Sequence, residues 1–249
     1  MVDFRAVRRA MVDGQVRTSD VTNLDLIDAM LDIPREAFVP EPLAALAYLD
    51  RDLQLQAGSS APRYLLKPVA TARLVQAGNI RTTDRVLVVG STTGYSAAVV
   101  SRLANAVVAL EESPALADAA RNTLRHLGLG TVAPVIGRLV DGWPAAAPFD
   151  VILVEGGVET VPDGLFAQLS EGGRLVTVMY GGAGGGQEEG QGEGQGEGQG
   201  EGQGEGPLQG QVGKATLFRS IRGEVGGRPL FDCAAPLLPG FEKAPAFVF

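Results

Sequence analysis

The spacing of the hydrophobic positions changes near residue 85. Before that point apolar residues recur three and four positions apart, as at Phe4, Val7 and Met11, which predicts amphipathic helices. After it, continuous apolar runs such as 86–90 alternate with helical patterns. Strands that are apolar nearly throughout and alternate with helices are typical of a parallel sheet covered on both faces. The predicted fold class is therefore α/β, with a doubly wound and mostly parallel sheet.

These two patterns place the expected elements along the chain. Helices are expected at 4–16, 24–33, 69–77, 95–103, 114–127 and 165–169. Strands are expected at 86–90, 106–111, 131–137, 149–156, 173–180, 214–223 and 244–249. The connection from 173–180 to 214–223 predicts an antiparallel hairpin at the C-terminal end of the sheet. The helices before residue 80 form an N-terminal helical extension.

The segment 181–213 interrupts this hairpin with low-complexity sequence in which EGQG is repeated. Glycine and charge at this density cannot bury enough apolar surface to offset the entropy of ordering, so we predict a disordered insertion. Six of the 29 acidic residues of the chain lie inside the segment, and they dominate the formal charge of −8. That charge therefore indicates neither a nucleic-acid partner nor a membrane partner.

Composition also limits the compartment and the chemistry. Cys233 is the only cysteine, so no intramolecular disulfide is expected, and we interpret it as a small buried residue. His126 is the only histidine, and no metal site is expected. The N-terminus lacks the apolar block of roughly 7 to 15 residues that a signal peptide needs, and no run approaches the ~20 apolar residues of a membrane span. We predict a cytoplasmic monomer.

The loop after the first parallel strand carries the clearest candidate chemistry. Gly90 ends that strand and permits a tight turn, while Gly94 precedes the next helix. Glu111 ends the second strand, about 20 residues further on, where a carboxylate can accept hydrogen bonds from ribose hydroxyls. The pattern predicts an adenosine-containing ligand. The alternative is a turn that needs glycine for its geometry alone.

Several motifs of the chain, in their order, resemble the protein-L-isoaspartate O-methyltransferases. They are AMLDIPREAFVPEPLAALAYLDRDLQL, VLVVGSTTGYSAAV, VVALEE, DGWPAAAPFDVILVEGG and QLSEGGRLVTVM. The resemblance implies a Rossmann-like methyltransferase domain at 81–249, preceded at 1–80 by the helical extension and a substrate loop. It also implies S-adenosyl-L-methionine as cofactor and isoaspartyl residues of proteins or peptides as substrates. In the implied reaction, a carboxylate of the damaged residue attacks the methyl group.

The resemblance also implies the residues of the site. The implied cofactor-binding residues are Gly90, Ser91, Thr92, Gly94, Glu111 and Arg138. Among them, Glu111 is expected to hold the ribose. Two residues depart from the family pattern: Thr92 replaces the middle glycine of the loop, and Arg138 replaces the acidic residue that meets the adenine amino group. An arginine can stack on adenine but cannot accept that hydrogen bond.

The substrate loop departs further. The family loop resembles Q-T-I-S-x-P, whose hydroxyl residues face the substrate, whereas this chain has RYLLKP at 63–68. Ser59 and Ser60 lie nearby, and we assign them as the candidate catalytic residues. A methyltransferase with another acceptor, or a binding protein without activity, remains an alternative. A cleft that receives Ser59 or Ser60 favours the repair enzyme, whereas a cleft filled by Tyr64 or Leu66 favours the binding protein.

Overall fold

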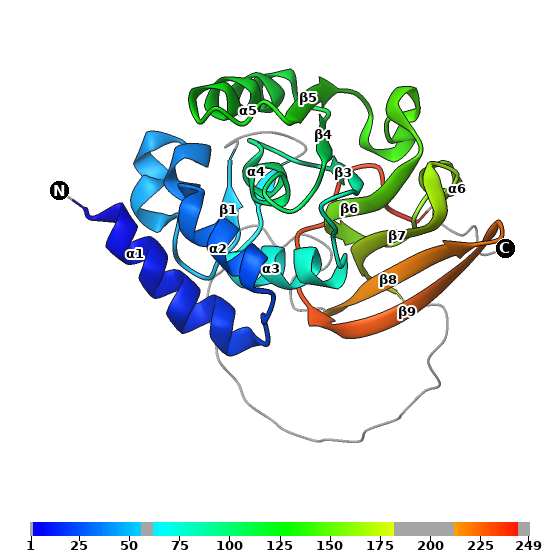
Figure 1. Cartoon of the computed structure of the whole chain (residues 1–249), viewed down its shortest axis with the longest axis horizontal. Helices are drawn as coiled ribbons and strands as arrows, with labels where there is room; N and C mark the ends of the chain where they lie inside the picture. The colour runs from blue at the N-terminus through cyan, green and yellow to red at the C-terminus, as the bar shows by residue number, and fades with distance from the viewer. Residues whose placement is uncertain (1, 56–61, 182–211, 244–249) are drawn as a thin grey trace, which may run out of the picture.

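A computed structural model describes residues 2–55, 62–181 and 212–243 (Figure 1). Its main sheet has the strand order β5-β4-β3-β6-β7-β8-β9. The strands from β5 to β7 in this order pair in parallel, and β8 and β9 add antiparallel pairs at one edge. The predicted fold class is confirmed, including the antiparallel hairpin between β7 and β8.

The strands of the main sheet lie close to the apolar runs of the sequence. They are β3 (Arg85–Val89), β4 (Ala106–Glu111), β5 (Val132–Ile136), β6 (Phe149–Val158), β7 (Leu169–Met179), β8 (Gly213–Ile221) and β9 (Glu224–Cys233). A second, two-stranded sheet pairs β1 (Leu53–Gln54) with β2 (Tyr64–Leu65) in antiparallel orientation. The short strand β2 brings the predicted substrate loop beside the main sheet.

Helices occupy the remaining regular segments. They are α1 (Phe4–Met11), which continues as a π-helix over Val12–Val16, then α2 (Leu24–Asp32), α3 (Pro68–Ala77), α4 (Tyr95–Val100), α5 (Pro114–His126) and α6 (Asp163–Phe166). Several helix starts carry a side-chain cap, as at Asn23, whose Oδ1 accepts a hydrogen bond from the Leu26 backbone at 3.0 Å.

The two faces of the sheet have separate hydrophobic cores. Val86 and Val88 of β3 pack with residues from α1 to α5, whereas Leu87 and Val89 pack with α6 and with Leu238 and Phe241, which follow β9. Successive residues of a strand point to opposite faces, so one buried strand contributes to both cores. Figure 1 shows α5 beside β4 and β5, and α6 beside β7, as this arrangement requires.

A buried arginine fastens the N-terminal extension to the rest of the fold. The Arg35 side chain is fully buried; its Nε donates to the carbonyl of Ala47 at 2.6 Å and its Nη2 to that of Leu66 at 2.5 Å. Its guanidinium also lies 4.6 Å from the ring centre of Tyr95 in α4. Arg35 thereby fixes residue 66 against the helix that follows the glycine loop. The proposed division at residue 80 stays a prediction.

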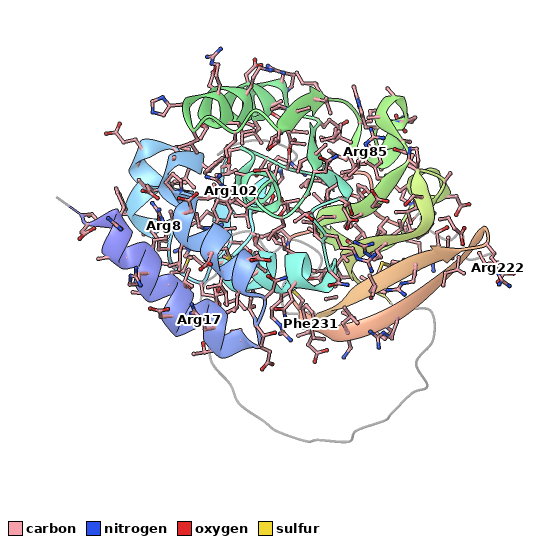
Figure 2. All side chains as sticks on the ribbon, in the orientation of Figure 1. Arg8, Arg17, Arg85, Arg102, Arg222 and Phe231 are labelled. Carbon is pink, nitrogen blue, oxygen red and sulfur yellow. The ribbon has the colours of Figure 1, made fainter. Side chains whose placement is uncertain are left out.

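Other side chains link the extension and the sheet edge. Arg8, labelled in Figure 2, donates to the Tyr48 hydroxyl at 2.9 Å and pairs with Glu36 at 3.1 Å. Arg73 of α3 lies 3.7 Å from the ring centre of Phe231, also labelled, on the edge strand β9. The Arg8 contacts join parts of the extension to one another, and the Arg73 contact joins the extension to β9.

Some expected elements are corrected by the structure. The last helix ends at Phe166, and Leu169 already begins β7; the helix at 95 ends at Val100. β9 was not expected, and Cys233 is its last residue. Gly213 belongs to β8 rather than to the insertion. The predicted disorder of 182–211 and the strand predicted at 244–249 lie outside the described residues.

Candidate active site

The glycine loop follows β3 at the carboxyl end of the sheet. Gly90 has φ +80°, and its backbone N–H and that of Ser91 both donate to the carbonyl of Leu110 at 3.0 Å. Gly94, at φ +92°, is the N-cap residue of α4. A side chain at either glycine would be strained by this backbone, and a Cβ at Gly94 would also lie 3.2 Å from that of Ala120. The loop therefore needs its outer glycines.

Thr92 stands between these glycines in a left-handed conformation, with φ +49°. That region disfavours a β-branched residue. Its backbone N–H donates to Glu111 Oε2 at 2.9 Å, which links the loop to the next strand. Thr92 therefore makes a backbone hydrogen bond to Glu111 in a conformation that is strained for a threonine.

Glu111 ends β4 and is completely buried. Its Oε1 accepts from the backbone N–H groups of Glu112 and Ser113, both at 3.0 Å. Its Oε2 accepts from Thr92 and from Arg63 Nη2, the latter at 2.9 Å, and both side chains of this ion pair are buried. The structure thus brings Glu111 to the glycine loop, as predicted, and adds an arginine from the substrate loop.

Glu155 is a buried acid that the sequence analysis missed. It lies near the carboxyl end of β6, the neighbour of β3, and accepts a hydrogen bond from the Ser96 hydroxyl in α4. Burial raises its pKa to about 7, while the Ser96 hydrogen bond and the charges of Arg35 and Arg63 act in the opposite direction. Its sequence signal was an acid inside an otherwise apolar run, VILVEGG.

A small cavity lies where the loops meet. It has a volume of about 10 Å³ and is lined by 62–64, Leu66, Glu155 and 236–238. Tyr64 and Leu66 both line it, and Leu66 is itself buried. Leu238 covers the glycines: a Cβ at Gly156 would lie 2.4 Å from its Cγ. The cavity is therefore bounded by the substrate loop on one side and by the segment after β9 on the other.

Three predicted site residues are not part of this cluster. Ser59 and Ser60 lie outside the described residues, so their catalytic assignment stays a prediction. Arg138 follows β5, and the preceding Gly137 N–H donates to the carbonyl of Glu111 at 3.2 Å. The Arg138 side chain is 70% exposed and lies 3.5 Å from Asp141. Its predicted role at the adenine stays a prediction as well.

The described residues hold no cluster of three or more His, Cys, Asp and Glu suited to a metal ion. Within the same ranges, no helix is long and apolar enough to cross a bilayer. Cys233 is buried, and burial raises the pKa of its thiol. That burial confirms the interpretation of Cys233 as a small buried residue.

A family model described as protein-L-isoaspartate(D-aspartate) O-methyltransferase matches residues 7–188. The chain belongs to this family. A protein-L-isoaspartate O-methyltransferase of Methylorubrum extorquens is 43% identical over 185 residues, which are 74% of this chain and 78% of the relative. One from Opitutus terrae is 41% identical over 169 residues, covering 68% and 71%. The resemblance seen in the motifs is confirmed.

Solved structures of the family show the same fold. A protein-L-isoaspartate O-methyltransferase superposes with a TM-score of 0.72 at 25% identity; the match covers 94% of this chain and 66% of the other. A Plasmodium falciparum protein assigned to the same class, solved in complex with S-adenosyl-L-homocysteine, superposes with a TM-score of 0.64 at 15% identity, covering 96% and 99%. At that identity the second match supports the fold alone.

Proposed function

We propose that this member of the family transfers a methyl group from S-adenosyl-L-methionine to a carboxylate of an isoaspartyl residue in a protein or peptide. One observation carries the proposal: a buried carboxylate, Glu111, stands at the end of β4 and is hydrogen-bonded to the glycine loop that follows β3. In open parallel sheets ligands bind at this edge, beyond the carboxyl ends of the strands. The names of the relatives support the same activity.

The residues of the loop fit such a cofactor. Gly90 presents bare backbone, and the Ser91 hydroxyl is buried without a hydrogen-bond partner among the described residues, so it has a donor to offer a ligand. Glu111 is placed to hold the ribose hydroxyls. When bound, S-adenosyl-L-methionine supplies a methyl group on a positively charged sulfur, which a carboxylate can displace directly.

The chain needs to do little chemistry beyond positioning. A substrate carboxylate is already ionised at neutral pH, so no general base is required. The single histidine agrees with this, since His126 is exposed at the end of α5. The strand ends beside the glycine loop and Leu238 are buried, which would help to keep water away from a cofactor bound there.

The test combines binding and transfer. Calorimetric titration with S-adenosyl-L-homocysteine should show binding by the wild type that Glu111→Gln loses and that Glu112→Gln keeps, because Glu112 is exposed and next in sequence. Labelled methyl transfer to an isoaspartyl peptide should then exceed transfer to the matching aspartyl peptide. Equal binding by all three proteins would refute the assignment of Glu111 as the ribose ligand, and absence of binding by the wild type would refute the cofactor assignment. Equal labelling of both peptides would refute the substrate assignment.

One observation favours a second candidate, a methyltransferase with a different carboxylate or hydroxyl acceptor. Leu66 occupies the position of a family hydroxyl residue. It is buried, and its backbone carbonyl accepts a hydrogen bond from Arg35. A substrate that depends on a hydroxyl at this point would lose that contact. Cofactor binding without any preference for the isoaspartyl peptide would support this candidate.

We also propose that the protein acts as a cytoplasmic monomer, with the division between extension and catalytic domain at residue 80. The buried free thiol of Cys233 agrees with a reducing compartment. Light scattering during size-exclusion chromatography would show a mass near 25.9 kDa for a monomer. A mass twice that value would refute the monomer.

A further inference from the structure

The chain itself occupies every acceptor position of Glu111. A carboxylate offers about four such positions, and four donors of this chain fill them: three backbone N–H groups and Arg63 Nη2. The backbone donors belong to the glycine loop and to the turn that follows β4. Arg63 is the side-chain donor, so ribose hydroxyls reach Glu111 when Arg63 leaves it.

The same arginine fills the space that a nucleoside needs. A Cβ built on Gly90 would lie 3.0 Å from Arg63 Nη2 and 3.0 Å from Leu238 Cδ2. The cavity beside these atoms, at about 10 Å³, has room for about one water molecule. With Arg63 on Glu111, the ribose position is closed both by hydrogen bonding and by volume.

An arginine that leaves a buried carboxylate needs another one, because the guanidinium keeps its charge at any physiological pH. Glu155 supplies it. Glu155 lines the same cavity as Arg63, and its carboxylate accepts one hydrogen bond, from Ser96, among the described residues. Arg63 Nε is buried without a hydrogen-bond partner in that same part of the chain. Within the described ranges, Arg63 therefore has an unused hydrogen-bond donor, and Glu155 has unused acceptor positions, beside the same cavity.

We propose that Arg63 is the gate of the cofactor site: it closes the ribose position by pairing with Glu111 and moves to Glu155 when the cofactor binds. The inference rests on the proposed function, since it describes how that cofactor gains entry. Glu155 then acts as a positioning residue that receives the displaced guanidinium. The acid buried at the end of β6 has a role that the transfer reaction alone does not require.

A second buried pair shows what a purely structural arginine looks like in this fold. Arg174 pairs with Asp84, and its other donors bind the carbonyls of Gly78 at 2.9 Å and Asn79 at 3.0 Å. Among the described residues, the Arg63 side chain instead makes one hydrogen bond, to Glu111, and its Nε has no partner. Arg174 therefore supplies a matched control for the loss of a buried ion pair elsewhere in the fold.

The experiment measures the dissociation constant of S-adenosyl-L-homocysteine by calorimetry for the full chain and a set of variants. Arg63→Gln removes the gate charge while keeping a polar side chain. It should bind more tightly, and the gain should be about tenfold for an open fraction of about one tenth in the wild type. Glu155→Gln should bind more weakly than the wild type, since the displaced arginine then has no buried partner.

The double variant separates this role from direct contact with the cofactor. If Glu155 acts by receiving Arg63, Glu155→Gln changes the affinity less than about twofold in the Arg63→Gln background. Arg174→Gln, the control for loss of a buried pair, should leave the dissociation constant unchanged. Urea unfolding establishes that each variant is folded. If Arg63→Gln does not fold, Arg63→Met, which also removes the charge, replaces it and should still bind more tightly than the wild type.

Each other outcome counts against the gate. Unchanged or weaker binding by Arg63→Gln, with normal binding by the wild type, overturns the gate and leaves the proposed function standing. An equal loss from Glu155→Gln in both backgrounds overturns the exchange of partners, because Glu155 then contacts the cofactor itself. Absence of binding by both the wild type and Arg63→Gln overturns the proposed function and the gate together.

Discussion

Replacing Glu155 by glutamine should make the protein more stable at neutral and alkaline pH. The carboxyl is buried near the end of β6, and desolvation raises its pKa from the ordinary 4.5 to about 7. Arg35 and Arg63 lower that pKa and Glu111 raises it, so the shift already includes the neighbouring charges. Glutamine has nearly the same shape and still accepts the Ser96 hydroxyl, but it carries no charge.

The sign follows from proton linkage. Above pH 4.5 the unfolded chain ionises this group while the folded protein holds it protonated, so the unfolded state gains free energy of ionisation and stability falls. The loss accumulates until about pH 7, where the folded group ionises too. A shift of this size, at 1.36 kcal/mol per pKa unit, corresponds to about 3 kcal/mol of unfolding free energy.

Urea unfolding of the wild type and Glu155→Gln at several pH values between 4.5 and 8.5 measures this difference. The two proteins should have similar stability at the acidic end, and the variant should gain about 3 kcal/mol on the wild type by pH 8. Glu112→Gln, at an exposed acid, is the matched control. A difference between wild type and Glu155→Gln that does not change with pH would refute the reasoning, because the buried group would then titrate as it does in the unfolded chain.

Three further substitutions probe the same region, each by urea unfolding. Thr92→Gly should raise the unfolding free energy by about 1 kcal/mol by relieving the left-handed backbone at φ +49°; a loss would mean that the threonine side chain contributes more than the strain. Leu238→Ala should lower it by about 3 kcal/mol, because the buried side chain packs on Gly90 and Gly156, and a change below 1 kcal/mol would contradict that packing. Ser96→Ala removes the hydroxyl donor to Glu155, so the pKa of that carboxyl should rise further and the pH-dependent loss should extend to higher pH; an unchanged pH profile would contradict it.

The fold could be predicted wherever the sequence pattern is local. The central strands are continuous apolar runs because both of their faces are buried, and β3 shows this with Val86 to Val89 inaccessible to solvent. β9 has no such run. Its residues are mostly exposed, Gly226 and Gly227 lower its strand propensity, and Pro229 is tolerated because the strand lies at the edge of the sheet. Its pairing with β8 depends on tertiary contacts that the local sequence pattern does not contain.

The same distinction between local patterns and tertiary contacts applies to the residues of the site. Gly90, Gly94 and Glu111 could be predicted because a fixed spacing after one strand places them at the same end of the sheet. The contact of Arg63 with Glu111 joins residues 48 positions apart, and Leu238 reaches Gly90 from the end of the described chain. No periodicity or motif records such contacts. They arise from how the extension and the segment after β9 close over the sheet.

The unusual residues of this chain form one connected group. An arginine buried at position 63 requires a carboxylate, and Glu111 provides it. If that pair were permanent, Glu155 would be a second buried acid with a raised pKa and, among the described residues, one hydrogen-bond donor. Its burial would destabilise the fold at neutral pH without a compensating interaction. If Arg63 changes partners, both acids are needed: Glu111 serves the closed site and Glu155 the open one. The otherwise unfavourable burial of Glu155 is thus accounted for by the movement of Arg63.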